Sequence, residues 1–251
     1  MIKVGDVFTT NNSCDVEVVK YEGANKITVE FLDSHGHRAV TKSSHLYAGV
    51  LKNPYQPNVF GVGYIGVGTH KSSTRANMNP IYNLWQRMIA RCYQPLYLNK
   101  NASYRDCFVT NDWHNFQNFA DWVESNPYYD ESFQLDKDLL VSNSKVYSPE
   151  VCVFVPQLIN VMLVDENSRT GEYPIGVGFS KDCQLYYAKV NIKGVKKHIG
   201  SFDNVMDAQK AYAEAKESYV KDVAKEWQDK INPRVFDRLM KWTVPNTWVR
   251  D

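Results

Sequence analysis

The C-terminal third of the chain contains the pattern that most restricts its fold. Residues 185–192 alternate as in a β-strand, which predicts that Ala188, Val190 and Ile192 point inward and their neighbours outward. Further strands are expected near 173–177 and 196–203, and an alanine-rich helix follows them. Small inward residues allow such a helix to lie close to the sheet. The segment therefore predicts a three-stranded antiparallel sheet with a helix on one face.

The outward face of this sheet is expected to be basic. Five lysines lie between residues 174 and 200, against one acidic residue, Asp182, although the whole chain of 251 residues has a formal net charge of +1. Lysines neutralise DNA phosphates, and amide side chains can reach base edges. The alternative is a lysine-rich face that contacts only solvent. The candidate DNA-binding residues are Lys181, Tyr187, Lys189, Asn191, Lys193, Lys196, Lys197 and His198.

Residues 173–225 resemble the Apetala (ethylene-response-factor) type of DNA-binding domain. The shared motifs are an aromatic residue before Gly-Val at 176–177, aromatic-Ala-x-aliphatic at 187–190, aliphatic-Gly-small-Phe-Asp at 199–203 and Ala-x-x-Ala-Tyr at 208–212. The resemblance implies that the sheet lies in the major groove of double-stranded DNA. In that family, sheet arginines and tryptophans contact bases. Here no arginine remains on the sheet, which weakens bidentate recognition of guanine. The matching positions hold Gly178, Lys189, Asn191, Lys196 and His198.

A second compact unit precedes this segment. A short strand is expected at 135–140, a turn around 142–145 and a second strand at 151–155. Pro156 then opens a helix that contains Asn160. The order of elements predicts a ββα unit.

This unit resembles the HNH nuclease motif of phage homing-type endonucleases, through Asp136-Lys137-Asp138, Ser148-Pro149-Glu150-Val151-Cys152 and Asn160. Hydrolysis of a phosphodiester requires a base that activates water and a cation that takes charge on the leaving oxygen. The resemblance implies a divalent cation, Mg²⁺, held by Asp136, Asp138 and Asn160. The candidate catalytic residues are Asp138, Asp136, Lys137 and His114.

The sequence departs from the HNH pattern at the base. Where the family has a histidine, this chain has Lys137 or Asp138, and none of its six histidines lies inside the unit. His114, in the preceding predicted helix, is the nearest. An aspartate is a weak base unless burial raises its pKa. Three alternatives follow: an active nuclease with a variant site, a unit that binds DNA without cutting it, or two carboxylates on a solvated strand edge.

The N-terminal residues 1–52 predict a small β-barrel of the SH3-like kind. Residues 16–21 and 26–32 alternate as strands, with turns at 22–25 and 34–37. Such a module serves either as a docking site, for a host protein, or as a structural cap. Residues 53–78 contain four glycines but lack the Lys-Ser/Thr ending of a phosphate-binding loop, so a flexible linker is expected.

From Asn79 the pattern becomes helical, with Pro80 in the first turn. One face carries Ile81, Leu84, Trp85, Met88, Ile89 and Cys92. A second helix, capped by Asp112, is expected to bury Phe116, Phe119, Ala120 and Val123. A last helix begins at 232–233 and ends near Trp242. The predicted regions are thus 1–52, a linker at 53–78, a helical and ββα region at 79–168, and an Apetala-type domain at 169–251.

The bulk properties add the cellular setting. Five cysteines without close spacing exclude the usual zinc-finger patterns and predict reduced, mostly buried thiols. No apolar signal region or membrane-length segment occurs. Taken together, the chain is similar to phage HNH homing-endonuclease-like proteins. The sequence predicts an α+β, metal-dependent DNA endonuclease in the cytoplasm of an infected bacterium, with no membrane partner. The alternative is a catalytically inactive DNA-binding or interaction protein that acts on a host factor.

Overall fold

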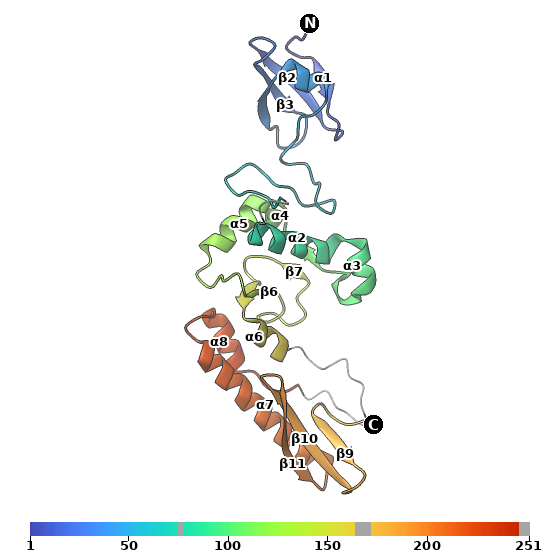
Figure 1. Ribbon diagram of the computed structural model, residues 1–251, viewed down its shortest axis with the longest axis vertical. Coiled ribbons are helices and arrows are strands. Elements are labelled where there is room, and N and C mark those ends of the chain that lie inside the picture. Colours follow the sequence, from blue (N-terminus) through green and yellow to red (C-terminus); the bar gives the residue numbers. More distant parts are fainter. Residues whose placement is uncertain (75–77, 164–171, 246–251) are drawn as a thin grey trace. The chain divides into compact units, whose positions relative to one another are not determined.

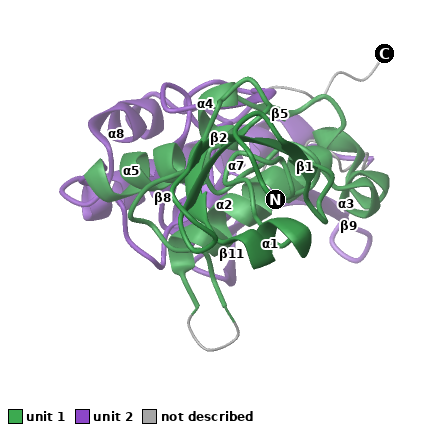
Figure 2. Ribbon diagram, turned by 90° about the horizontal axis from the view of Figure 1, so that it is seen from above, with its two compact units in different colours: residues 1–125 green, residues 126–251 purple. Residues whose placement is uncertain are grey.

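The computed structural model describes residues 1–74, 78–163 and 172–245. The chain divides into two compact units, residues 1–125 and 126–251, and both contain helices and strands (Figure 2). The predicted α+β class is therefore confirmed. Within the described ranges, no helix is long and apolar enough to cross a lipid bilayer. Cys92, Cys107 and Cys152 are buried free thiols, as predicted.

The first unit begins with a small antiparallel sheet, drawn in blue in Figure 1. Its strand order is β1-β2-β3-β4. Its elements are β1 (Val7–Thr9), β2 (Asp15–Tyr21), β3 (Ile27–Phe31) and β4 (Arg38–Thr41), followed by α1 (Ser43–Tyr47). Alternate residues of β2 and β3, including Val16, Val18 and Val29, are fully buried. The predicted central strands and the turn between them are therefore confirmed.

The predicted closed barrel is not found. Among the described residues, β1 pairs only with β2 and β4 pairs only with β3, so the sheet is open. After β4 the chain enters the short helix α1 instead of another strand, and β1 has only three residues. In the part of the chain that the structure describes, no strand therefore connects the two edges of the sheet.

The glycine-containing segment packs against the helices of the first unit, which differs from the flexible linker expected at 53–78. Val59 forms a β-bridge with Gly63, and Tyr64 forms one with Asn115. The side chain of Gln117 accepts the backbone N–H of His70 at 3.0 Å and donates to the carbonyl of Ile65 at 3.1 Å. The described part of the segment is thus fixed by hydrogen bonds.

Among its described residues, five helices and a short strand complete the first unit. Asn79 caps the first helix by accepting the N–H of Tyr82, as predicted. The second predicted helix is broken at Asn115 into two, and Asp112 lies inside the first piece instead of capping it. The predicted core residue Phe116 is fully buried. The elements are α2 (Pro80–Tyr93), α3 (Pro95–Lys100), a 3₁₀ helix (Ala102–Tyr104), β5 (Phe108–Val109), α4 (Asn111–His114) and α5 (Phe116–Ser125).

The second unit contains the predicted ββα arrangement. Strands β6 and β8 pair antiparallel, with Gln134 opposite Val155. The first strand is shorter than expected, because Oδ1 of Asp136 accepts the N–H groups of Asp138 and Leu139 and turns the chain. The elements are β6 (Gln134–Asp136), β7 (Val146–Tyr147), β8 (Val153–Val155) and α6 (Gln157–Met162).

The predicted C-terminal sheet and its helix are also present. Its antiparallel strands have the order β11-β10-β9, and Ala188 and Val190 are buried against the helix residues Ala208 and Tyr212. The elements are β9 (Val177–Ser180), β10 (Leu185–Ile192), β11 (Val195–Phe202), α7 (Val205–Trp227) and α8 (Pro233–Met240).

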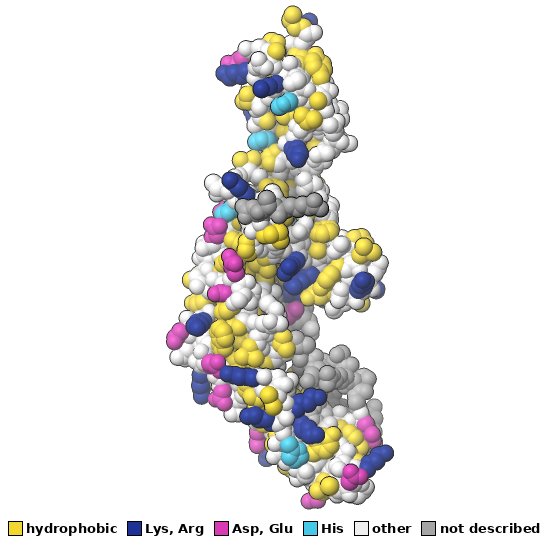
Figure 3. Space-filling model, viewed as in Figure 1, with side chains coloured by type: hydrophobic (Ala, Val, Ile, Leu, Met, Phe, Trp, Pro, Cys, Tyr) yellow, Lys and Arg dark blue, Asp and Glu magenta, His cyan; other side chains and the backbone are white. Residues whose placement is uncertain are grey.

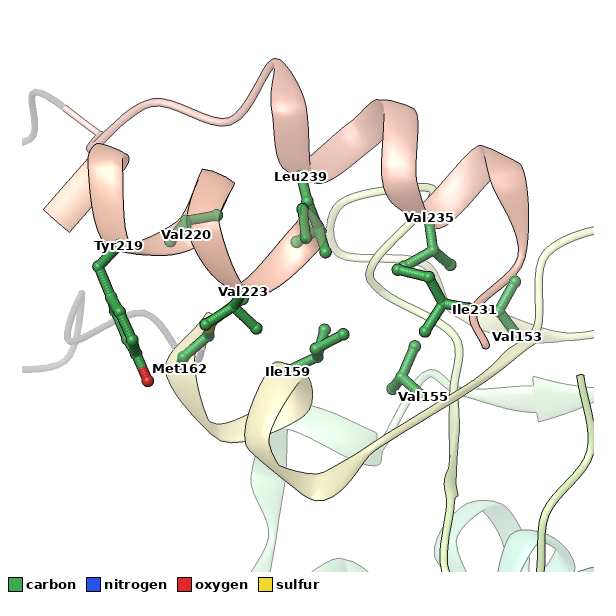
Figure 4. Packing of buried hydrophobic residues seen from close by; sticks show 11 residues of the cluster. Val153, Val155, Ile159, Met162, Tyr219, Val220, Val223, Ile231, Val235 and Leu239 are labelled. Atoms are coloured by element: carbon green, nitrogen blue, oxygen red, sulfur yellow. The ribbon is translucent and has the colours of Figure 1, made fainter. Parts of the chain in front are cut away.

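Helix α7 joins two hydrophobic cores. Its first half covers the sheet, and its second half packs with β8, α6 and α8 (Figure 4). In the second core Val220 and Val223 of α7 lie with Ile159 of α6 and Leu239 of α8. The ββα unit and the C-terminal domain, which the sequence separated at residue 168, therefore share this core.

Candidate nucleic-acid interface

The register of the C-terminal sheet determines which side chains share its outer face. Directly opposed residues of antiparallel strands point to the same side. Lys189 lies opposite His198, and Asn191 lies opposite Lys196. Since the intervening Val190 is buried toward α7, these four side chains point away from the helix. All four residues are exposed.

Tyr187 completes this face. It lies opposite Ser201 on β11 and Gly178 on β9. A Cβ atom at Gly178 would come within 2.5 Å of the Tyr187 ring and hydroxyl, so the ring extends across the glycine. The Lys189 ammonium lies 4.3 Å from the Tyr187 ring centroid. We call Tyr187, Lys189, Asn191, Lys196 and His198 the outer sheet face. Figure 3 shows basic side chains, with a histidine, in the region of this sheet.

A β-bulge separates Lys197 from this face. The register shifts between Ala188 and Lys189, because Gly200 pairs with the first and His198 with the second. Ile199 is therefore the extra residue. Beyond the bulge Lys197 lies opposite the buried Val190, which places it on the helix side of the sheet edge.

Two other predicted DNA contacts lie outside the outer sheet face. Lys193 occupies the β10–β11 turn with a φ of 49°. Its Nζ pairs with Glu226 of α7 at 2.9 Å, and its backbone N–H donates to Tyr219 Oη at 3.2 Å. The hydrogen bond and the charge of Glu226 raise the pKa of Lys193. Lys181 is exposed in the turn between β9 and β10.

In the ββα unit, the Asp136 carboxyl is hydrogen-bonded to the backbone of the turn that follows it. Its Oδ1 accepts the N–H of Asp138 at 2.8 Å and that of Leu139 at 2.6 Å. Burial raises the pKa of the Asp136 carboxyl above its usual value, and these two hydrogen bonds only partly oppose the shift. The carboxyl thus ends β6 and orders the following turn.

The Lys137 ammonium is buried and is itself the cation that the neighbouring groups bind. Only 7% of the residue is exposed, and its Nζ donates to both carboxylate oxygens of Asp138, at 2.8 Å each. The same Nζ donates to the carbonyl of Ser144 at 2.5 Å and lies 5.9 Å from the centroid of the Tyr147 ring. Lys137 therefore neutralises Asp138 and holds the loop that contains Ser144.

The three predicted metal ligands all make contacts within the ββα unit. Both oxygens of Asp138 face the Lys137 ammonium, and Oδ1 of Asp136 is hydrogen-bonded to the backbone. The Asn160 amide nitrogen donates to Oε1 of Gln134. The Lys137 ammonium repels a cation at Asp138, while the hydrogen bonds named here do not use Oδ2 of Asp136 or Oδ1 of Asn160, so the metal site stays a prediction. Among the residues that the structure describes, no group of three His, Cys, Asp or Glu side chains is placed to hold a metal.

His114, the remaining catalytic candidate, belongs to the first unit. Its Nε2 lies 3.3 Å from Tyr93 Oη, and the two rings are in edge contact. Burial lowers the pKa of His114 below its usual value. The side chain is thus half-buried and contacts an aromatic ring.

Sequence reasoning missed the two features that select the outer sheet face. One is the bulge at Ile199, for which the alternation of β11 gives no signal. The other is the acidic partner of Lys193, although Tyr219 and Glu226 are seven residues apart and so share one face of α7. No protein-family model matches the chain, and neither a curated protein nor a solved structure matches it.

Proposed function

We propose that the protein binds double-stranded DNA through the outer sheet face and does not cut it. The observation that carries the proposal is the register of β10 and β11, which brings two lysines, an asparagine, a histidine and a tyrosine onto one exposed face. The Apetala-type motifs at the same positions support this function.

Each side chain has a role in this proposal. Lys189 and Lys196 neutralise phosphates, which supplies sequence-independent affinity. Asn191 lies opposite Lys196 and two residues from Lys189 on β10, and it can pair with the N6 and N7 edge of adenine in the major groove. Tyr187 supports Lys189 by a cation–π contact.

The ββα unit supports binding without cleavage. Lys137 takes the position next to Asp138 that a metal ion would need, and Asp136 and Asn160 are engaged in hydrogen bonds within the unit. An HNH-like scaffold in this state can contact DNA, but an ammonium group stands beside Asp138 and the unit lacks the histidine base of the resembled nucleases.

Two adjacent lysines provide the test, because they lie on opposite sides of the sheet. Binding to a fluorescently labelled duplex is measured by anisotropy over a range of salt concentrations. We expect Lys196→Glu to weaken binding by about tenfold or more, and Lys197→Glu, with the same charge change, by less than about threefold. Equal losses for the two variants, or none, would contradict the proposed face.

Cleavage is tested on supercoiled plasmid with Mg²⁺ or Mn²⁺. We expect the plasmid to remain intact under conditions in which the duplex is bound. Nicking that Asp138→Ala and Asn160→Ala both abolish would overturn the non-cutting proposal and establish a metal-dependent endonuclease.

A further inference from the structure

The first unit contains a cavity that the proposed DNA binding does not use. Its volume is about 510 Å³, within the range of small-ligand sites, and it lies between the ends of β2 and β3 and the segment 53–64. All of its lining residues belong to the first unit and are described. The cavity therefore provides a site of its own.

Three rings form an aromatic wall of this cavity. His35 stacks on Tyr55 with ring centroids 4.3 Å apart, and Tyr64 lies 5.8 Å from Tyr55 and 5.7 Å from His35. Burial, with the neighbouring Tyr55 and Asp112, raises the pKa of Tyr64 and keeps its phenol neutral. The negative faces of tyrosine rings attract cations.

The charged lining residues are acidic. Asp15 and Asp33 line the cavity, and no lysine or arginine is among its described lining residues. Burial acts to raise the pKa of Asp33, but hydrogen bonds from Asn53 and from the N–H groups of His35 and Gly36 outweigh it and lower the pKa. Asp33 therefore stays ionised at neutral pH.

Asn53 shows that the carboxylate is held in a fixed position. The residue is buried, its amide nitrogen donates to Oδ2 of Asp33, and its Oδ1 accepts the N–H of Tyr55 at 2.9 Å. This one side chain connects the acidic and aromatic walls. A carboxylate oxygen has two lone pairs, so Oδ2 of Asp33 can accept another donor.

We propose that this cavity binds an arginine side chain presented by a partner protein. A guanidinium group stacks on aromatic rings and donates hydrogen bonds to carboxylates in its own plane, and it combines these two contacts better than a lysine ammonium does. At Asp33 it would donate to Oδ2, because Oδ1 already accepts the N–H groups of His35 and Gly36. Two carboxylates repel nucleic-acid phosphates, so this site is distinct from the outer sheet face. The proposal does not depend on DNA binding.

Isosteric peptides provide the test. The full-length protein, labelled for NMR, is titrated with acetyl-Gly-Arg-Gly-amide and with the same peptide containing citrulline, which has the shape of arginine without its charge. We expect the arginine peptide to shift the His35, Tyr55 and Tyr64 signals with an affinity at least about tenfold higher than that of the citrulline peptide, a difference of about 1.4 kcal/mol. Equal binding of the two peptides, or no shift of these signals, would overturn the proposal.

Variants locate the effect. Asp33→Asn and Asp15→Asn should each lower the affinity for the arginine peptide. The control is Asp106→Asn, at an exposed acidic residue of the same unit outside the cavity, which should leave this affinity unchanged. The second acidic variant covers the case in which Asp33→Asn disturbs its own loop. A short DNA duplex is the competing probe: if it shifts the same three aromatic signals, the site is not selective for a cation and the proposal fails.

Discussion

The Lys189 ammonium lies 4.3 Å from the centroid of the Tyr187 ring, and these two residues are separated by a single residue on β10. The ring itself extends over Gly178 of the neighbouring strand. The position of the lysine charge on the outer sheet face therefore depends on a tyrosine, and the position of the tyrosine depends on a residue without a side chain.

We predict that Gly178→Ala weakens DNA binding by displacing this tyrosine. The added Cβ would lie 2.5 Å from the ring, so the Tyr187 side chain must shift, and we expect this shift to break its contact with Lys189. A cation–π contact at an exposed site contributes about 0.5–1 kcal/mol, so the expected loss in affinity is about two- to fivefold. Anisotropy measurements on Gly178→Ala, Tyr187→Ala and the double variant form a cycle. In the Tyr187→Ala background the glycine change should have no further effect, and an additive loss would contradict the mechanism.

Asn191 and Lys196 are directly opposed on the outer sheet face, and we predict different effects for them. Asn191→Ala should reduce discrimination between a selected duplex and a scrambled one, by about 1–3 kcal/mol, with the salt dependence unchanged. Lys196→Gln should weaken binding to both duplexes by the same factor. It should also lower the magnitude of the slope of log affinity against log salt concentration by about 0.9. Selection from a random duplex pool, followed by salt titrations, provides both measurements. A lower salt slope for Asn191→Ala would exclude base contact.

The sequence predicted elements where burial repeats with a regular period. The predicted burial of Ala188, Val190 and the Phe116–Val123 helix face is confirmed. Strand alternation and helical spacing follow directly from the burial of one side of an element. The prediction of a closed N-terminal barrel was wrong. Closure requires that the first and last strands of the sheet pair with each other, and the sequence pattern of single strands does not indicate this. Lys197 was named as a DNA contact together with Lys196 and His198, but alternate residues of a strand face opposite sides, and Lys197 lies opposite the buried Val190. Which of the two sides faces outward depends on the single bulge residue Ile199.

The candidate catalytic site shows a different limit. The sequence indicated that Asp136, Asp138 and Asn160 could bind a metal ion through their side-chain oxygens. The structure places all three residues in the ββα unit. The hydrogen-bond partner of each of these side chains depends on side-chain geometry, which the spacing of residues along the sequence does not define. Lys137 pairs with its own neighbour Asp138, and the carbonyl that completes its site comes from Ser144, seven residues away.

We predict that Lys137→Met destabilises the protein by about 1–3 kcal/mol, because the buried carbonyl of Ser144 loses its donor and Asp138 loses its counter-charge. Methionine has a similar length, so loss of packing contributes little. Urea unfolding followed by circular dichroism measures the free energy of unfolding. The control is Lys210→Met, an exposed lysine of α7, which should change it by less than about 0.5 kcal/mol. Equal effects of the two substitutions would contradict a structural role for Lys137.

The buried carboxyl of Asp136 gives a prediction with a defined pH dependence. Burial raises its pKa above the usual 3.8, so the folded state binds this proton more tightly than the unfolded state does. Ionisation of Asp136 therefore opposes folding at neutral pH, and this cost disappears as the pH falls through the raised folded pKa and then through 3.8. Asp136→Asn keeps the oxygen that accepts the N–H groups of Asp138 and Leu139 but carries no charge.

The asparagine variant should consequently be more stable than the wild type near pH 7, and its advantage should shrink as the pH is lowered toward about 4. Asp136→Ala lacks the acceptor and should be less stable than Asp136→Asn at every pH, by about 1–2 kcal/mol. Urea unfolding of the three proteins at several pH values measures both differences. If Asp136→Asn is less stable than the wild type at neutral pH, the charged carboxylate is needed for the fold, and the assignment of Asp136 as a buried acceptor that ends β6 is wrong.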